Sequence, residues 1–556
     1  MPEKKIYEII IRGLASLGLA AYFLSGKNMA IVLEERDIHM KKKLRGLFRI
    51  IFGRTAFVMA GLGLQLWVFI AAFKFLNGYL HYFYILCVLL SALAVIAILN
   101  EPIDSSFKMA WIIPVLVIPV FGVLLYIFVQ MQFQTKALAR RLAASTAKTR
   151  PYLNQNEDVR KELEALDGRT AGLADYLERM AGAPVYKNTD IEYFPLGEDM
   201  FVRLIEELKA AKHFIFMEFF IIDRGYMWDE ILKVLEEKVK EGVEVRVMYD
   251  GMCCLMLLPF HYPRQLERKG IRCKMFSPII PVLSTHQNYR DHRKIAVIDG
   301  RCAFTGGVNL ADEYINRKVR FGHWKDTALM VRGDAVKSFT MMFLQMWDVT
   351  EKKEEDYRRY LSAPAGEAAA GRMEKGYVIP YGDSPFDKEQ IGEQVYLDIL
   401  SQAKEYVHIM TPYLILDDGM KDALCYAAKR GVEVIIIMPH IPDKKYAYLL
   451  ARTYYPELLK AGVRIFEYEP GFVHAKVFAS DDEKATVGTI NLDFRSLYLH
   501  FECGTFLYRN PVIEKIEADY QETLKKCIPV TLETCYSYSW LGRKAGRLLR
   551  LIAPLM

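Results

Sequence analysis

The sequence lacks the residue spacings that hold a metal ion or a redox centre. No CxxC pair occurs among the nine cysteines of its 556 residues, and no Asp, Glu, His and Cys cluster has ligand spacing. Neither a zinc site nor a dithiol centre is therefore indicated. An odd number of irregularly spaced cysteines is typical of reduced, mostly buried thiols. We expect no metal and no cofactor, and activity that persists in the presence of a chelator.

A strong charge of one sign is also missing. The net charge is +6 with 25% charged residues, and no long basic groove is evident, which argues against nucleic acid as a partner. Apolar residues, in contrast, are abundant: 52% of the chain is hydrophobic, more than a soluble enzyme needs. The length exceeds one ordinary core, so several structural units are expected.

Three apolar runs lie near the N-terminus, at about 55–76, 82–99 and 109–129. Each is close to the roughly 20 residues that a helix needs to cross a hydrocarbon core of about 30 Å. We therefore predict a multi-pass protein of the cell membrane with three transmembrane helices. An earlier apolar stretch, 6–24, is interrupted by Arg12 and suits an interfacial helix or a fourth span. It has no convincing cleavage site and does not resemble a removed signal peptide.

The charges that flank these runs make the orientation ambiguous. Residues 38–54 and 130–150 are both basic and contain no acid. The positive-inside rule assigns both flanks to the cytoplasm, whereas three spans would separate them. Either one run is re-entrant or one flank breaks the rule. On this pattern we expect the catalytic part at the cytoplasmic face.

The chain beyond the membrane region repeats one pattern of strands and helices. Residues 211–218 and 242–247 are predicted strands with a helix between them, and residues 403–410 and 431–436 repeat this arrangement. The alternation predicts an α/β fold of two homologous halves, each a sheet flanked by helices, that form one active site. In chain order we expect a basic N-terminal segment 1–54, a transmembrane region 55–130, a helical connector 131–190, half 1 at 191–351, a linker 352–376, half 2 at 377–530 and a basic amphipathic tail 531–556.

The end of the tail, 540–556, carries basic residues among leucines, namely Arg543, Lys544, Arg547 and Arg550. This spacing suits an amphipathic helix on an anionic membrane surface. A terminal helix packed on the catalytic part is an equally open interpretation.

Each half contains the motif HxKxxxxD followed by GxxN. The first copy supplies His292, Lys294, Asp299 and Asn309, and the second supplies His474, Lys476, Asp481 and Asn491. In a strand, residues i and i+2 point to the same face, so the His and Lys of each motif project together. An imidazole can act as nucleophile or acid, an ammonium can hold a phosphate oxygen, and an Asn can donate to a second oxygen. Two copies at the same point of a repeat predict one shared active site.

These motifs make the sequence resemble the phospholipase D superfamily over roughly 191–530, and within it the bacterial cardiolipin synthases. The narrower likeness rests on 288–294, 324–327, 491–496 with 501–502, and 108–114 with 119–122. The chain departs from that family at His500, where Asn is frequent, and at Lys325, where Arg is frequent.

The resemblance implies a phosphatidyltransferase with a phosphohistidine intermediate. His292 would attack phosphorus and His474 would act as acid and then as base. Asp326 and Glu502 are implied as the partners that orient the two histidines. The lysines and asparagines of the motifs would hold the phosphoryl oxygens. The motif aspartates, Asp299 and Asp481, complete the catalytic motifs and are expected to brace them structurally.

The implied reaction transfers a phosphatidyl group between two phosphatidylglycerol molecules and yields cardiolipin and glycerol. The alternative is a membrane-bound phospholipase D that uses the same residues to release phosphatidic acid. A nuclease is disfavoured by the apolar runs, and an inactive membrane scaffold is disfavoured by the two intact motifs. The expected partners are phosphatidylglycerol and other membrane lipids, and the sequence does not indicate an oligomeric state.

Overall fold

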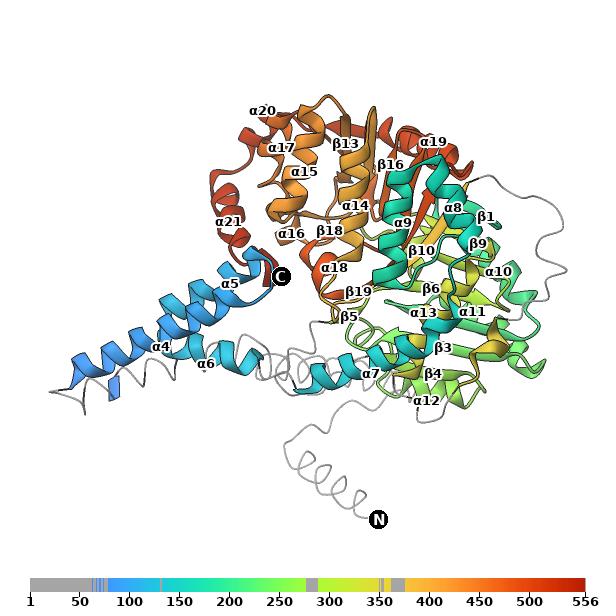
Figure 1. Ribbon diagram of the computed structural model, residues 1–556, viewed down its shortest axis with the longest axis horizontal. Helices are drawn as coiled ribbons and strands as arrows, with labels where there is room; N and C mark the ends of the chain where they lie inside the picture. The colour runs from blue at the N-terminus through green and yellow to red at the C-terminus, as the bar shows by residue number, and fades with distance from the viewer. Residues whose placement is uncertain are drawn as a thin grey trace, which may run out of the picture. The chain divides into compact units, whose positions relative to one another are not determined.

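The computed structural model describes residues 79–555 apart from 131–132, 277–288, 350, 352–354 and 362–375, with a few isolated positions between 63 and 74 (Figure 1). Residues up to Leu86 form one compact unit, of which mainly the start of a helix is described, and residues from Cys87 form another. The predicted N-terminal segment 1–54 and nearly all of the apolar run 55–76 lie outside the described residues.

Two mixed β-sheets with the same strand order confirm the predicted α/β fold of two homologous halves. The order is β1-β9-β7-β6-β2-β3-β4 in half 1 and β10-β19-β17-β16-β11-β13-β14 in half 2, where β20 (Cys527–Pro529) is added at the edge. The strands of half 1 are β1 (Thr189–Phe194), β2 (Phe214–Phe219), β3 (Glu244–Asp250), β4 (Arg272–Phe276), β6 (Lys294–Ile298), β7 (Cys302–Gly306) and β9 (Ala328–Gly333). Those of half 2 are β10 (Tyr377–Asp383), β11 (Tyr406–Met410), β13 (Glu433–Pro439), β14 (Arg464–Tyr468), β16 (Val477–Ser480), β17 (Lys484–Gly488) and β19 (His500–Tyr508).

The central strands are buried on both faces because helices cover both sides of each sheet. Every residue of β2 and β6 is buried, which explains why these strands are almost continuously apolar instead of alternating. The helices of half 1 are α10 (Gly197–Lys209), α11 (Tyr226–Lys240), α12 (Tyr262–Glu267) and α13 (Val336–Asp348). Those of half 2 are α14 (Ile391–Gln402), α15 (Asp418–Lys429), α16 (Lys445–Ala451), α17 (Tyr455–Ala461), α18 (Phe494–Tyr498) and α19 (Val512–Leu524).

A shared hydrophobic core fuses the two halves. It contains Val297 of β6 and Val477 of β16, together with Phe339 of α13 and Ile516 of α19. Helix α13 packs on its own strand β6 and on β10 of the other half, and α19 packs on β16 and on β1. The two motif strands are therefore held in one rigid core, which places the residues that precede them next to one another.

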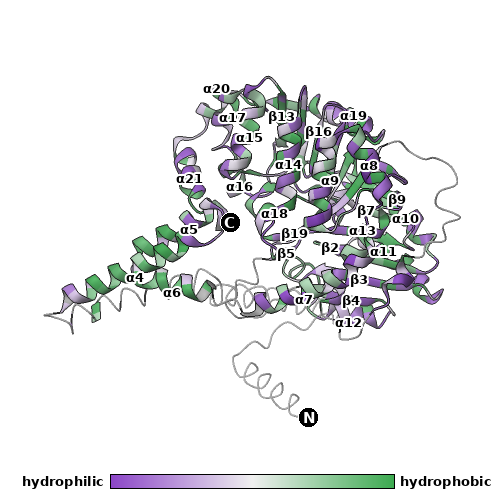
Figure 2. Cartoon of the chain, in the orientation of Figure 1, coloured by the Kyte–Doolittle hydropathy of each residue, from purple (hydrophilic) through white to green (hydrophobic). Residues whose placement is uncertain are grey.

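Helix α4 (Leu80–Asn100) coincides with the second apolar run. Among the described residues it is the one helix long and apolar enough to cross a membrane, with a hydropathy of 2.7 over His81–Asn100. Large apolar side chains such as Leu89 and Leu93 are more than half exposed along it. Figure 2 shows that hydrophobic residues also predominate along α5 (Ser105–Val117) and α6 (Pro119–Gln130), where Val117 and Leu124 are more than half exposed. Such a surface is stable in lipid and costly in water.

The third apolar run, 109–129, differs from the single helix expected from the sequence. It is divided into α5 and α6, because the backbone of Ile118, which precedes Pro119, leaves the helical region. The chain then folds back: the rings of Trp111 and Tyr126 are 5.8 Å apart, whereas a straight helix would separate them by about 22 Å. Gly122 permits the close approach, since a Cβ there would lie 2.4 Å from the carbonyl oxygen of Pro114. Each helix of this hairpin is too short to span a bilayer.

The stretch between the membrane region and half 1 is helical, as α7 (Phe133–Thr149), η1 (Arg150–Tyr152), α8 (Glu157–Leu166) and α9 (Gly168–Ala181). The chain ends in α20 (Leu532–Ser537), α21 (Trp540–Arg550) and the short η5 (Ala553–Leu555). Short elements near the motifs are β5 (Arg290–Asp291), η3 (Asp312–Ile315), β8 (His323–Lys325), β12 (Leu414–Ile415), β15 (Gly471–Val473) and β18 (Leu492–Asp493).

Candidate active site

Each motif histidine directly follows a short strand that pairs with a strand of the other half. Strand β5, just before His292, pairs in parallel with the start of β19 of half 2, and β15, just before His474, pairs in parallel with β8 of half 1. The N–H of His292 donates to the carbonyl oxygen of Phe501 at 2.9 Å, and that of His474 donates to Lys325 at 2.7 Å. Both histidines are thus fixed by the half to which they do not belong.

The side chains repeat this crosswise arrangement. Nδ1 of His292 is 2.8 and 2.9 Å from the two carboxylate oxygens of Glu502 in half 2. Nδ1 of His474 is 2.6 Å from Oδ2 of Asp326 in half 1. Both acids are fully buried. A carboxylate that accepts the Nδ1–H proton leaves Nε2 of each ring with its lone pair free for a substrate.

Lys294 and Lys476 concentrate positive charge beside the histidines. The Nζ of Lys294 donates to the carbonyl oxygen of His292 at 2.5 Å, and Lys476 makes the same bond to His474. Burial lowers the pKa of Lys294 to about 8 and that of Lys476 to about 7. An anionic phosphate would compensate these partly desolvated ammonium groups, so the site suits a phosphodiester.

The two motifs act on one another electrostatically. Burial, and then the charges of Lys294 and Lys476, hold the pKa of His292 well below its usual value. Burial, followed by the same two lysines, also lowers the pKa of His474. Each histidine therefore responds to the lysine of the opposite half, which is the behaviour of one common site. Burial also raises the pKa of Asp326 to about 7.

We expect kcat/KM for a phosphodiester lipid to fall as the pH rises from about 7 to about 9, because kcat/KM reports ionisations of the free enzyme. A lysine with a lowered pKa is charged below that pKa and neutral above it, so Lys476 and then Lys294 lose their hold on the phosphate. Initial rates at low substrate concentration across this range measure the effect. The variant Lys476→Arg keeps its charge and is expected to shift the decline to higher pH. A flat profile would contradict this account.

The motif aspartates do not line the site. They follow the far ends of β6 and β16 with a φ of 54° each, and their carboxylates accept backbone N–H groups at the start of β2 and β11. The donors are Lys212, His213 and Phe214 for Asp299, and Lys404, Glu405 and Tyr406 for Asp481. The motif therefore groups Asp299 and Asp481 with the catalytic residues, but the structure places their carboxylates at the far ends of the motif strands. There they brace the fold, as expected.

The two motif asparagines differ in what they leave free. Asn309 accepts the N–H of Ile221 at 3.0 Å and donates to the hydroxyl of Tyr314 at 2.8 Å, which holds that ring beside His474. Asn491 is buried, and its Oδ1 has no hydrogen-bond partner among the described residues. Because a free amide oxygen accepts hydrogen bonds, Asn491 is the better placed of the two to contact a substrate hydroxyl.

The sequence did not predict that the rings of Phe220 and His500 lie next to the ring of His292. The ring of His292 lies 4.5 Å from that of Phe220 and 5.3 Å from that of His500. Neither ring nitrogen of His500 has a hydrogen-bond partner among the described residues, and burial lowers its pKa to about 3. One signal was available, because His500 and Glu502 are two apart on one strand and share a face. Phe220 comes from a loop and carried no such signal.

His292, His500 and Glu502 also place ligand-type atoms within 4.8 Å of one another. Glu502 is already bonded to His292 and accepts the hydroxyl of Thr489. The adjacent charges of Lys294 and Lys476 oppose a cation at this position. Because Glu502 already serves His292 and Thr489, and the nearby lysines repel a cation, the trio does not fit a metal site well, and activity in chelator stays a prediction.

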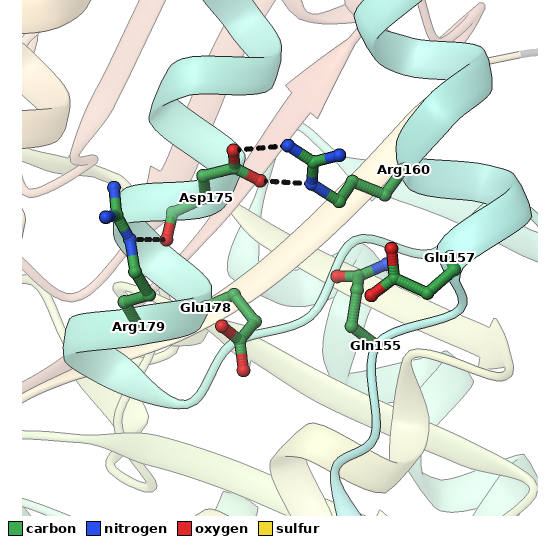
Figure 3. Close-up of a pocket in the computed structure, with 6 residues that line it drawn as sticks. All are labelled: Gln155, Glu157, Arg160, Asp175, Glu178 and Arg179. Atoms are coloured by element: carbon green, nitrogen blue, oxygen red, sulfur yellow. Dashed lines mark hydrogen bonds and ion pairs between the residues drawn. The ribbon is translucent and has the colours of Figure 1, made fainter.

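A charged surface notch lies between α8 and α9, away from the motifs. It is lined by Gln155, Glu157, Arg160, Asp175, Glu178 and Arg179 (Figure 3). Arg160 and Asp175 form a two-point ion pair at 2.7 and 2.8 Å. Arg160 is thus neutralised by Asp175 and joins α8 to α9, while Arg179 donates to the carbonyl oxygen of Asp175, so the notch serves the packing of the connector.

Half 1 carries a buried ionic cluster under His292 that half 2 lacks. Arg293 bonds to Glu218 at 2.8 Å and approaches Asp291 at 3.5 Å, while Arg290 lies 3.6 Å from Asp250. The corresponding positions of half 2 in the repeat are apolar: Ala475, Met410, Val473, Phe472 and Pro439. The duplicated halves are therefore not equivalent around their histidines.

Arg293→Ala is expected to destabilise the protein by about 3–5 kcal/mol, because it leaves the buried carboxylate of Glu218 without its cation. The double variant Glu218→Met with Arg293→Ala copies half 2 and should recover part of the loss. Thermal unfolding of both variants measures the difference. Equal stability of the single and double variants would contradict the assignment.

Two homologous α/β halves that share one His-Lys site define a phospholipase D-like enzyme. A family model described as "Cardiolipin synthase, PLD-like domain" matches residues 204–347 and 396–524, and one described as "Phospholipase_D-nuclease N-terminal" matches 89–130. The chain belongs to the cardiolipin synthase family, as two curated relatives show. It is 31% identical to the cardiolipin synthase of Halalkalibacterium halodurans, over 83% of this chain and 91% of that protein. It is 33% identical to cardiolipin synthase 2 of Bacillus anthracis, over 81% and 87%.

A protein of Streptococcus mutans is more similar still, with 51% identity over 83% of this chain and 99% of its own length. Among solved structures, the phosphatidylserine synthase of Haemophilus influenzae shares the fold, with a TM-score of 0.51 and 15% identity over 70% of this chain and 98% of that one. These likenesses agree with the phospholipase D-like fold that the sheet order defines.

Proposed function

We propose that the protein is a cardiolipin synthase that transfers a phosphatidyl group from one phosphatidylglycerol to another. In the first step Nε2 of His292 attacks phosphorus, the bond to glycerol breaks, and His474 gives the departing oxygen a proton. In the second step His474 takes the proton of a hydroxyl on the second phosphatidylglycerol, whose oxygen displaces His292 from phosphorus. Cardiolipin and glycerol leave, and both histidines return to their initial state.

The crosswise pairing of His292 with Glu502 and of His474 with Asp326 carries this proposal. It gives two imidazoles, each with a buried partner on Nδ1, and both lie close enough to Lys294 and Lys476 to feel their charge. The negative charge of a bound phosphate would raise the pKa of His474 again, so that it can hold the proton it must donate. Lys294 and Lys476 are proposed to hold the phosphoryl oxygens as charge develops in the transition state, and the Nδ2–H group of Asn491 is proposed to donate to one of them.

The experiment that tests the proposal is incubation of purified protein, in bilayers that contain labelled phosphatidylglycerol, with products identified by mass. Cardiolipin and free glycerol in equal amounts are expected. Phosphatidic acid as the main product would favour the alternative, a phospholipase D with water as acceptor. A His292→Ala preparation controls for contaminating activity.

We further propose a multi-pass arrangement with the catalytic part at the cytoplasmic face. If the run 55–76 and α4 both cross the bilayer, the α5–α6 hairpin returns the chain to the side it entered, and both basic flanks, 38–54 and 130–150, lie in the cytoplasm. This removes the conflict that three full spans would create.

Cysteine labelling of intact cells tests this topology in a background without accessible native cysteines. An impermeant maleimide is expected to label Asn77→Cys, between the run 55–76 and α4, but neither Arg45→Cys nor Lys148→Cys before lysis. External labelling of only one of the two basic flanks would show that they lie on opposite sides.

A further inference from the structure

Helix α21, near the C-terminus, packs on the catalytic part with one face only. Gly546 is buried on α16, where an added Cβ would lie 2.8 Å from Cγ2 of Thr453 and 2.9 Å from the carbonyl oxygen of Leu449. The guanidinium of Arg550 lies over the ring of Tyr454 at 4.3 Å. The helix is therefore held closely to half 2, and its orientation is fixed by this contact.

The opposite face of α21 is apolar and exposed. Leu541 is 72% exposed and Leu548 is 67% exposed, and Trp540 at the start of the helix is 62% exposed. Beyond the helix, Leu551 and Ile552 are also about half exposed. Positions 541 and 548 are seven residues apart and share one side of α21, so their side chains form one exposed apolar stripe on the helix. A soluble surface rarely shows such a stripe unless something covers it.

Two cations border the stripe. Lys544 and Arg547 are exposed on the same side, whereas Arg543 and Arg550 are turned toward half 2. Apolar side chains edged by Lys and Arg are the pattern of a helix that lies in the headgroup layer of an anionic membrane. The sequence left two interpretations open, a packed helix and a membrane helix. The face of α21 with Gly546 and Arg550 is packed on half 2, and the opposite face has the pattern of a membrane helix.

The chain immediately after α21 adjoins the membrane region. The short η5 packs against α5, the first helix of the apolar hairpin, and against α18 of half 2. Phe107 of α5 also contacts the rings of Phe494 and Tyr498 in α18, at 5.7 and 5.5 Å. The exposed stripe of α21 therefore lies in the chain next to a segment that packs on α5, one of the apolar helices that are expected to lie in lipid.

We propose that the outward face of α21, formed by Trp540, Leu541, Lys544, Arg547 and Leu548, docks on the surface of an anionic bilayer and holds half 2 against it. The leucines and the tryptophan enter the boundary between headgroups and acyl chains, and the two cations bind lipid phosphates. The choice of phosphatidylglycerol as the anionic lipid rests on the proposed function; the docking itself does not.

The test uses the full-length protein in bilayers of phosphatidylcholine with brominated acyl chains, with or without phosphatidylglycerol. Quenching at Trp540 is obtained as the difference between the unaltered protein and Trp540→Phe. We expect strong quenching when phosphatidylglycerol is present. The reversal Lys544→Glu with Arg547→Glu is expected to remove it, since each cation near an anionic surface contributes about fivefold to binding.

The matched control is Lys404→Glu with Lys429→Glu, which makes the same charge change at exposed positions of half 2. Both control residues lie at the end of the sheet remote from the motifs, near the start of β11 and the end of α15. Quenching that survives in the control pair but not in the reversal pair supports the proposal. The reversal should also lower turnover in bilayers while sparing turnover of phosphatidylglycerol dispersed in detergent.

Three results would overturn the proposal. Absence of bromolipid quenching at Trp540 in either bilayer would exclude contact with lipid. Quenching that is indifferent to phosphatidylglycerol would exclude an anionic surface as the partner. Protection of Trp540 from an aqueous quencher without bromolipid quenching would mean that a protein, such as a second copy of the chain, covers the stripe. Because these readouts do not need catalysis, they remain valid even if the cardiolipin synthase activity is not found.

Discussion

Replacement of His292 or His474 by alanine is expected to lower phosphatidyl transfer by about 10³–10⁴-fold or more, since a nucleophile and an acid–base group cannot be replaced by binding alone. The two variants should nevertheless fail at different steps. His474→Ala keeps the attacking imidazole and should accumulate a phosphatidyl-histidine from a substrate with a good leaving group. His292→Ala should form none.

The measurement is mass spectrometry of peptides from enzyme quenched during turnover, together with the rate of cardiolipin formation. His213→Ala serves as control, because it removes an exposed imidazole outside the site. An adduct on His474 in the His292 variant would reverse the assigned roles. Adducts in neither variant, together with undiminished turnover, would exclude the phosphohistidine route.

The second large effect concerns the acids. Glu502→Gln and Asp326→Asn are each expected to reduce transfer by about 10²–10⁴-fold, because the amide cannot hold the imidazole in the required tautomer or stabilise its cation. The crosswise contacts predict which step each change affects. Glu502→Gln, made in half 2, should behave like the loss of His292 in half 1. Asp326→Asn, made in half 1, should behave like the loss of His474 in half 2.

Phosphohistidine yield in the two acid variants separates these outcomes. Little adduct is expected with Glu502→Gln, and a persistent adduct with Asp326→Asn. Glu469→Gln, at an exposed position of half 2, controls for the loss of a negative charge. If each acid instead affected the histidine of its own half, the crosswise geometry would not operate in the working enzyme.

The arrangement also makes both halves necessary for either histidine. The N–H groups and Nδ1 atoms of His292 and His474 are held across the boundary between halves, and the shared core around α13 and α19 fixes that boundary. Separately produced halves would therefore each present an imidazole without its carboxylate. Pre-organisation of the site depends on this fusion of the two sheets.

Much of the fold was predictable from the sequence because its signals are local. The alternation of strands and helices, repeated at 211–247 and 403–436, predicts two α/β halves, and the sheets show this order twice. The spacing of His292 and Lys294 predicts that the two side chains project together, because residues i and i+2 of a strand share a face. The second apolar run likewise predicts a helix of the length that α4 has.

The sequence was less informative where a signal had more than one structural solution. The run 109–129 is apolar throughout, and hydropathy alone does not distinguish one span from two packed short helices. The distinction came from Pro119, which ends the first helix, and from Gly122, which allows the return. Similarly, Asp299 belongs to the motif by sequence, yet it stands at the end of the strand opposite to His292.

By itself, the sequence determined the duplication, the motifs and the apolar segments, because periodicity and composition act over a few residues. Only the tertiary structure decided how the two motifs cooperate. Glu502 is 210 positions from His292 and Asp326 is 148 from His474, and no local pattern couples positions so far apart. Those contacts exist because a common hydrophobic core packs two sheets together, and the energy of that packing depends on the whole chain.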